Sequence, residues 1–166
     1  MKASIELTLR TREVFKLFER KINGDRLFMN TVLHKFNKVM NLRKQPTGLT
    51  TYHQMVQTML TLTQQFTDEI NRFEEILEKR RDLTNKKISF LTQYPTAIIV
   101  NNPLSMHLVE FIEIYDRLVA LMKLLHLADC FTTENDYYAN IKRIQTQANK
   151  MLSSILLAPQ IKESVI

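Results

Sequence analysis

The scarcity of glycine and proline constrains the fold of this chain more than any other feature of its sequence. Only two glycines and four prolines occur in 166 residues. These two residue types interrupt helices and supply tight turns, so a chain that has few of them favours long helices over many hairpins. Apolar residues make up 45% of the chain, which is enough for a buried core. We therefore predict a mainly α protein.

Positive charge is concentrated at the start of the chain. The first 44 residues contain 11 Lys and Arg against 4 Asp and Glu, whereas the remainder contains 12 against 13. A basic patch of this kind is typical of proteins that bind a polyanion such as nucleic acid. A Gln-Pro-Thr-Gly sequence follows the basic segment at 45–48. We therefore predict two units, a basic unit over 1–44 and a helical unit over 45–166.

The basic unit opens with a run of alternating apolar and polar residues over 4–10. Ile5, Leu7 and Leu9 share one side of this run. A period of two predicts a strand with one buried face. The polar side chains of the run therefore face away from the core.

A strand followed by two helices is the predicted order of the basic unit. Thr11 is a favourable N-cap for a helix over about 12–22. Asn-Gly-Asp at 23–25 predicts a turn, because Asn and Gly tolerate a positive φ. A second apolar stripe predicts a helix over about 26–42.

The second unit is predicted to contain about three long helices. Their apolar stripes cover about 50–83, 105–127 and 133–158. Two short apolar segments, 88–91 and 97–100, lie between the first two of these helices. Each is compatible with a short strand or with an ordered buried loop.

No catalytic, metal-binding or cofactor-binding motif is recognisable in the sequence. The four histidines are scattered, and Cys130 is alone, so neither an internal disulfide nor a multi-cysteine zinc site is possible. Two glycines are too few for a phosphate-cradling loop. We therefore expect no enzyme activity, no metal, no cofactor and no small-molecule substrate.

The sequence also predicts a cytoplasmic protein of a bacterial cell with no membrane partner. Glu6 and Arg10 interrupt the start of the chain, which therefore does not resemble a signal peptide. The longest apolar stretch, near 104–128, contains five charged residues. A membrane span does not tolerate that density of charge.

The order strand, helix, turn, helix is the ribbon-helix-helix arrangement. In it, two chains each donate one strand to an antiparallel ribbon that enters the major groove of double-stranded DNA. A lone strand leaves its backbone groups unpaired, so this interpretation requires a homodimer. The predicted base contacts are the polar side chains of the strand, Glu6, Thr8 and Arg10. The predicted phosphate contacts are basic side chains around it, namely Lys2, Arg12, Lys16, Arg20, Lys21 and Arg26.

An alternative interpretation has the strand pairing inside the chain, for example with 97–100. The lysines and arginines would then be an ordinary solvated surface. In that case the chain is a helical adaptor or scaffold with no nucleic-acid role.

Several short motifs extend across most of the chain. They are Thr-Leu-Arg-Thr-Arg at 8–12 with Leu17-Phe18, Asn102-Pro103, Tyr-Asp-Arg-Leu-Val at 115–119 and Leu-Leu-His-Leu at 124–127. With these motifs the chain resembles, from about 5 to 159, a family of integrating conjugative element proteins that includes the AcaB-type regulators of conjugative plasmids. One departure lies at 45–49, where Gln-Pro-Thr-Gly-Leu replaces the acidic Asp-Pro-Tyr-Ala-Asp-like stretch that is frequent in this family.

This resemblance implies a ribbon-helix-helix transcriptional activator of transfer genes, attached to a larger helical domain. Together with the basic strand-helix unit, it predicts a homodimeric, sequence-specific DNA-binding regulator of conjugative transfer. The alternative is an adaptor or scaffold of a conjugation or integrative-element system.

Overall fold

The computed structural model describes residues 1–80, 86 and 88–158. In this part of the chain the prediction of a mainly α protein is confirmed. The helices are α1 (Arg12–Glu19), α2 (Phe28–Leu42), α3 (Pro46–Glu78), α5 (Pro103–Leu127) and α6 (Glu134–Leu157). The strands are β1 (Ala3–Leu9), β2 (Lys21–Ile22), β3 (Arg26–Leu27) and β4 (Tyr94–Val100).

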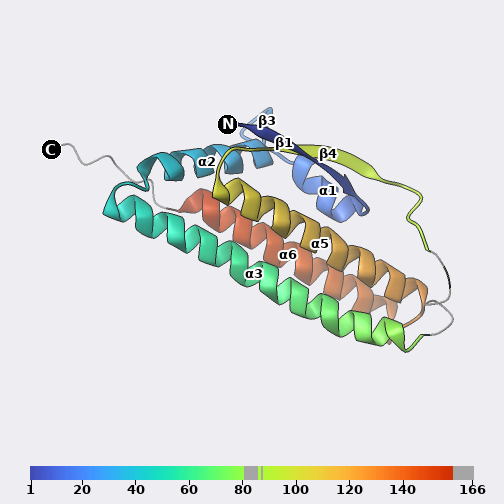
Figure 1. Ribbon diagram of the computed structural model, residues 1–166. Coiled ribbons are helices and arrows are strands. Elements are labelled where there is room, and N and C mark those ends of the chain that lie inside the picture. Colours follow the sequence, from blue (N-terminus) through green and yellow to red (C-terminus); the bar gives the residue numbers. More distant parts are fainter. Residues whose placement is uncertain (81–85, 87, 159–166) are drawn as a thin grey trace.

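The three longest helices, α3, α5 and α6, form a bundle (Figure 1). Helix α5 contacts both α3 and α6. Helix α3 has 33 residues, which at the rise of an α-helix span about 50 Å. Helices α1 and α2 and the β1–β4 pair lie across one side of this bundle, at the top of Figure 1.

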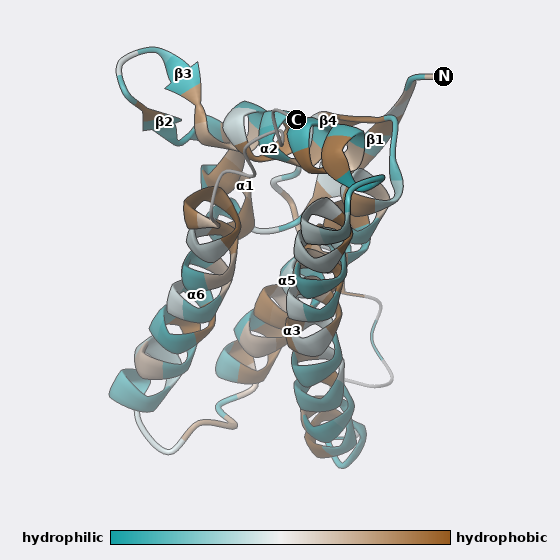
Figure 2. Cartoon of the chain, turned by 90° about the vertical axis from the view of Figure 1, so that its left-hand side faces the viewer, coloured by the Kyte–Doolittle hydropathy of each residue, from teal (hydrophilic) through white to brown (hydrophobic). Residues whose placement is uncertain are grey.

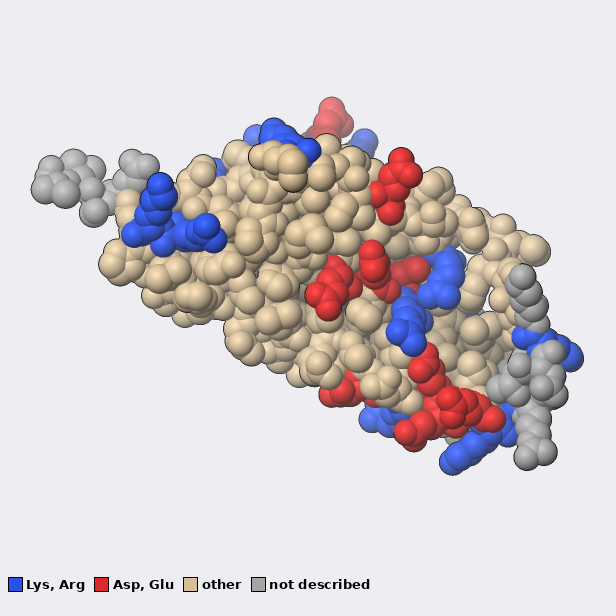
Figure 3. All heavy atoms as spheres, viewed as in Figure 1, with Lys and Arg blue, Asp and Glu red and all other residues tan. Residues whose placement is uncertain are grey.

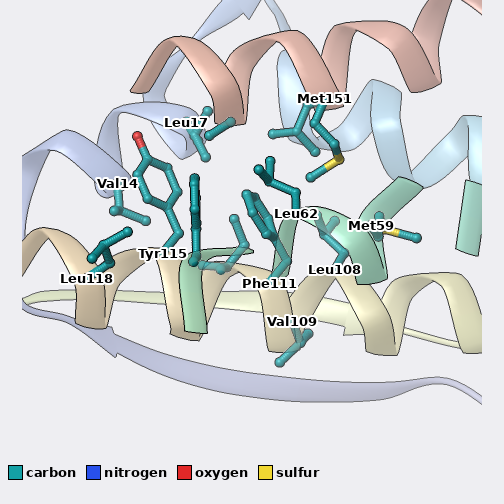
Figure 4. Packing of buried hydrophobic residues seen from close by; sticks show 14 of the residues in the cluster. Val14, Leu17, Met59, Leu62, Leu108, Val109, Phe111, Tyr115, Leu118 and Met151 are labelled. Carbon is teal, nitrogen blue, oxygen red and sulfur yellow. The ribbon is translucent and has the colours of Figure 1, made fainter. Parts of the chain in front are cut away.

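Helix α5 is the most buried element because apolar side chains cover most of its circumference. Its Phe111 and Tyr115 pack against Phe66 of α3, with ring centroids 5.7 and 5.8 Å from that ring. Figure 4 shows Leu17 of α1 and Met151 of α6 reaching the same cluster. The core therefore joins side chains from both predicted units, and the division at residue 44 stays a prediction.

Helix α3 begins at Pro46, about four residues earlier than the sequence predicted. Proline is favourable in the first turn of a helix, where its missing N–H is not needed. Gly48 is buried against the end of α2, and a Cβ atom there would overlap the carbonyl oxygen of Leu42. Pro46 and Gly48 thus form a tight corner between α2 and α3.

Helix α1 ends at Glu19, so the predicted extension to residue 22 is wrong. Residues 21–27 instead form the antiparallel β2–β3 hairpin. The predicted turn at 23–25 is confirmed, with φ of 50° at Asn23 and 90° at Gly24. Two residues in the left-handed region allow the chain to reverse over three residues.

Strand β1 pairs with β4 in the same chain, from Ala3 opposite Val100 to Leu9 opposite Tyr94. The alternative in which the strand pairs internally is therefore confirmed, and β4 starts earlier than the predicted 97–100. The argument that β1 needs a second chain to pair its backbone is wrong, because β4 supplies that partner. The other predicted short segment, 88–91, is irregular.

Candidate nucleic-acid interface

A buried carboxylate anchors the junction between β1 and α1. Asp116 of α5 is 4% exposed. Its carboxylate accepts hydrogen bonds from the backbone N–H groups of Arg10 at 3.0 Å and Thr11 at 3.0 Å, and from the Thr11 hydroxyl at 2.7 Å. The Arg10 side chain also lies beside it, with Nε 3.7 Å from Oδ2. The sequence placed Asp116 in a family-like motif but gave no sign of this role.

The open face of the β1–β4 pair carries two of the three predicted base contacts. Directly opposed residues of an antiparallel pair share a face, so Glu6 lies with Ala97 and Thr8 lies with Pro95. Glu6 is the one charged side chain that the described strands place on this face, and it is negative. Arg10 lies directly after β1, where its backbone N–H and its guanidinium contact the Asp116 carboxylate.

A groove between α1 and α6 gathers basic side chains that the sequence had not connected. This cavity has a volume of about 540 Å³ and is lined by Lys16 of α1, by Arg20 directly after α1 and by Lys150 of α6. Gln145 and Asn149 of α6 add amide groups to it. We call it the α1–α6 groove. It presents three cationic side chains and one carboxylate, that of Glu13, beside neutral hydrogen-bonding groups.

Arg20 connects the α1–α6 groove to the β2–β3 hairpin. Its guanidinium carbon lies 4.2 Å from the centroid of the Phe28 ring, a favourable cation–π geometry that orients the side chain. Lys21 and Arg26 are exposed on the hairpin itself. Figure 2 shows the hairpin and the β1–β4 pair at the same end of the molecule, with the hairpin on the side of α6.

The structure therefore separates the predicted contacts into groups. Lys16, Arg20, Lys21 and Arg26 belong to the groove and hairpin side, whereas Glu6 and Thr8 lie on the open face of the strand pair. Lys2 is exposed at the start of the chain, and Arg12 lines a different cavity with Arg10.

The α6 contribution was missed by sequence reasoning. Gln145, Asn149 and Ser153 recur at steps of four residues, and all three line the groove. That spacing places them on one face of a helix. Lys150 adjoins this polar stripe. The stripe was therefore the feature of the sequence that could have identified the α6 side of the groove.

Other surfaces carry mixed charge. Figure 3 shows acidic and basic side chains interspersed on the side seen in Figure 1. Two ion pairs link helices of the bundle, Arg117 with Glu74 at 2.5 Å and Arg143 with Glu69 at 2.5 Å. Such neutralised pairs do not present a field of one sign to a phosphate backbone.

Tyr115 and Glu13 form the inner wall of the α1–α6 groove. Tyr115 is buried in the core and also lines the groove. Burial, with a further effect of the Glu13 carboxylate, raises the pKa of Tyr115 well above its usual range. Glu13 itself lies 2.8 Å from Lys123 Nζ. The phenol is therefore a neutral hydrogen-bond donor at physiological pH.

We expect Tyr115→Phe to leave stability at pH 7 nearly unchanged, because its hydroxyl makes no hydrogen bond to any described residue. The wild-type protein should lose stability as the pH rises above 10.0, the unperturbed pKa of a tyrosine phenol, because the folded state opposes ionisation of Tyr115. The variant should lose less. Urea unfolding at pH 8 and pH 11 measures the difference, with the exposed Tyr138→Phe as control. Equal alkaline losses in wild-type and Tyr115→Phe proteins would contradict the assignment.

Neither a metal centre nor a membrane span is evident in the described residues. No group of three or more His, Cys, Asp or Glu side chains gathers there as metal ligands. None of the helices described is both long and apolar enough to cross a bilayer.

Comparison with known proteins gives a likeness of fold. No protein-family model matches the chain, and no curated protein matches it. The crystal structure of selenomethionine-containing AcaB from uropathogenic E. coli matches with a TM-score of 0.67 and 13% sequence identity. The match covers 93% of this chain and 77% of that chain. The two proteins thus share a fold.

Proposed function

We propose that this chain is a DNA-binding transcriptional regulator that activates conjugative transfer genes. In this proposal, the α1–α6 groove and the β2–β3 hairpin contact the DNA backbone. The observation that carries the DNA-binding proposal is the meeting of Lys16 and Arg20 with Lys150 in one groove. The regulatory role is supported by the motif resemblance to the AcaB-type family and by the shared fold.

The groove has the chemistry that a phosphate backbone requires. A lysine ammonium binds a phosphate as a point charge, and an arginine guanidinium binds it through two parallel hydrogen bonds. The amides of Gln145 and Asn149 supply neutral donors of the kind that fix position without reading sequence. Lys21 and Arg26 extend the basic surface from the groove along the hairpin.

Base reading is a separate part of the proposal and rests on β1. Among the described strands, β1 pairs with β4 alone, so its second edge has no strand partner there. We propose that β1 of a second copy pairs there, which makes the protein a homodimer with two β1 strands at the centre of a four-stranded sheet. Glu6 and Thr8 of both copies would then face base edges. Arg10 adjoins this set with 42% of its side chain exposed.

Fluorescence anisotropy of labelled duplexes tests the function. Fragments of the host element should bind the wild-type protein at 50 mM salt, and affinity should fall steeply towards 200 mM because bound cations are released from the phosphates. One fragment should bind more tightly than random duplexes of equal length. Light scattering should give the mass of a dimer.

The same measurements decide between this proposal and the adaptor interpretation. A protein that binds no duplex at 50 mM salt is not a DNA-binding regulator. A monomer that binds duplexes of every sequence equally would retain the groove assignment and overturn base reading by paired β1 strands.

A further inference from the structure

A second cavity lies between residues 88–94, the start of α1 and the end of α5. Its volume is about 470 Å³, which is within the range of small-molecule sites. Its walls combine aromatic and apolar side chains with Arg10, Arg12, Lys123 and His126. None of these residues lines the α1–α6 groove. We call this cavity the arginine pocket.

Two of the three Arg and Lys side chains in the arginine pocket lie beside carboxylates, and the third does not. Arg10 lies 3.7 Å from Asp116, and Lys123 lies 2.8 Å from Glu13. Arg12 is exposed and has no hydrogen bond, ion pair or ring contact with any residue in the described ranges. Its guanidinium is therefore available to an anion, because no carboxylate of the described residues pairs with it.

Aromatic rings line the same pocket as Arg12. His126 stacks on Tyr137 with ring centroids 4.0 Å apart and planes 4° apart. Phe90 lies in the 88–94 segment of the pocket wall, and its ring centroid is 6.0 Å from the guanidinium carbon of Arg10. Flat walls of this kind favour a planar ligand, because aromatic groups prefer offset stacking.

We propose that the arginine pocket binds a small organic anion that carries an aromatic ring. The ring packs against the aromatic and apolar walls, and the carboxylate or phosphate group binds Arg12 through two hydrogen bonds. Two sources share this chemistry, a nucleoside monophosphate and an aromatic carboxylate. The inference concerns the protein without DNA and does not rest on the proposed function.

Titration of the full chain, followed by amide NMR shifts, tests the proposal. The probes are AMP, salicylate, inorganic phosphate and adenosine. AMP or salicylate should shift the amide signals of residues 88–94 and 123–127, and should bind at least tenfold more tightly than phosphate or adenosine. If AMP binds more tightly than salicylate, the ligand is a nucleoside monophosphate. If salicylate binds more tightly, the ligand is an aromatic carboxylate.

Substitutions separate the arginine pocket from the α1–α6 groove. Arg12→Gln should weaken binding of the better probe at least tenfold, and Arg12→Lys should weaken it less because the charge remains. Lys150→Gln, in the groove, and the exposed Arg72→Gln should have no effect. Far-UV circular dichroism establishes that each variant is folded.

Three results would overturn the proposal. They are the absence of binding by both AMP and salicylate, equal binding of phosphate and AMP, or binding that survives Arg12→Gln. Loss of probe binding in Lys150→Gln with no loss in Arg12→Gln would place the anion in the groove instead.

Discussion

Asp116→Ala should lower the free energy of unfolding by about 3–5 kcal/mol, the usual cost of removing one partner from a buried charged network. The substitution leaves the backbone N–H groups of Arg10 and Thr11 and the Thr11 hydroxyl without their acceptor. Buried donors without acceptors retain the full cost of leaving water. Urea unfolding followed by circular dichroism at 222 nm measures the change.

Two further variants separate this network from a general effect of charge on α5. Asp116→Asn keeps one acceptor oxygen and the side-chain volume, so its loss should be intermediate. Glu113→Ala removes an exposed carboxylate of the same helix and should change stability by less than about 0.5 kcal/mol. A small loss in Asp116→Ala would show that β1 and α1 are held mainly by apolar packing.

The combined variant Lys16→Gln, Arg20→Gln and Lys150→Gln should bind DNA about 100-fold more weakly at 100 mM salt. This value follows if each contact contributes about 1 kcal/mol, because 1.4 kcal/mol is tenfold. The slope of log K against log salt should also fall by about 2.7, since each lost phosphate contact removes about 0.9. Anisotropy titrations at several salt concentrations give both quantities.

A matched variant distinguishes local contacts from long-range attraction. Lys38→Gln, Lys44→Gln and Lys79→Gln together remove the same net charge from exposed positions outside the groove. This variant should retain most of the affinity and most of the salt slope. Equal losses in the two triple variants would show that net charge, and not the groove, determines binding.

Local patterns in the sequence predicted much of the secondary structure. The alternation of Ile5, Leu7 and Leu9 identified β1, and Asn-Gly-Asp at 23–25 identified the turn of the β2–β3 hairpin. These features depend on neighbours within a few residues, which the sequence lists directly. The start of α3 was predicted about four residues too late, because the corner at Pro46 and Gly48 depends on the close approach of Leu42 in the preceding helix.

Long-range relations were predicted less well. The pairing of β1 with β4 joins residues about 90 positions apart and appeared only as an alternative. The anchoring of Arg10 and Thr11 by Asp116 spans more than 100 positions, and so does the approach of Lys150 to Lys16. Spacing along one helix or strand cannot reveal which elements meet. The charge of the first 44 residues therefore indicated a polyanion partner without indicating the face that binds it.

Lysine footprinting locates the surface of the protein that contacts the DNA. The protein is acetylated at low reagent concentration with and without a bound duplex, and mass spectrometry compares each lysine. Binding at the groove and hairpin predicts that DNA protects Lys16, Lys21 and Lys150, while Lys44 and Lys79 react as before. Protection of Lys44 and Lys79 with Lys16 and Lys150 unchanged would place the DNA on another surface and overturn the groove assignment.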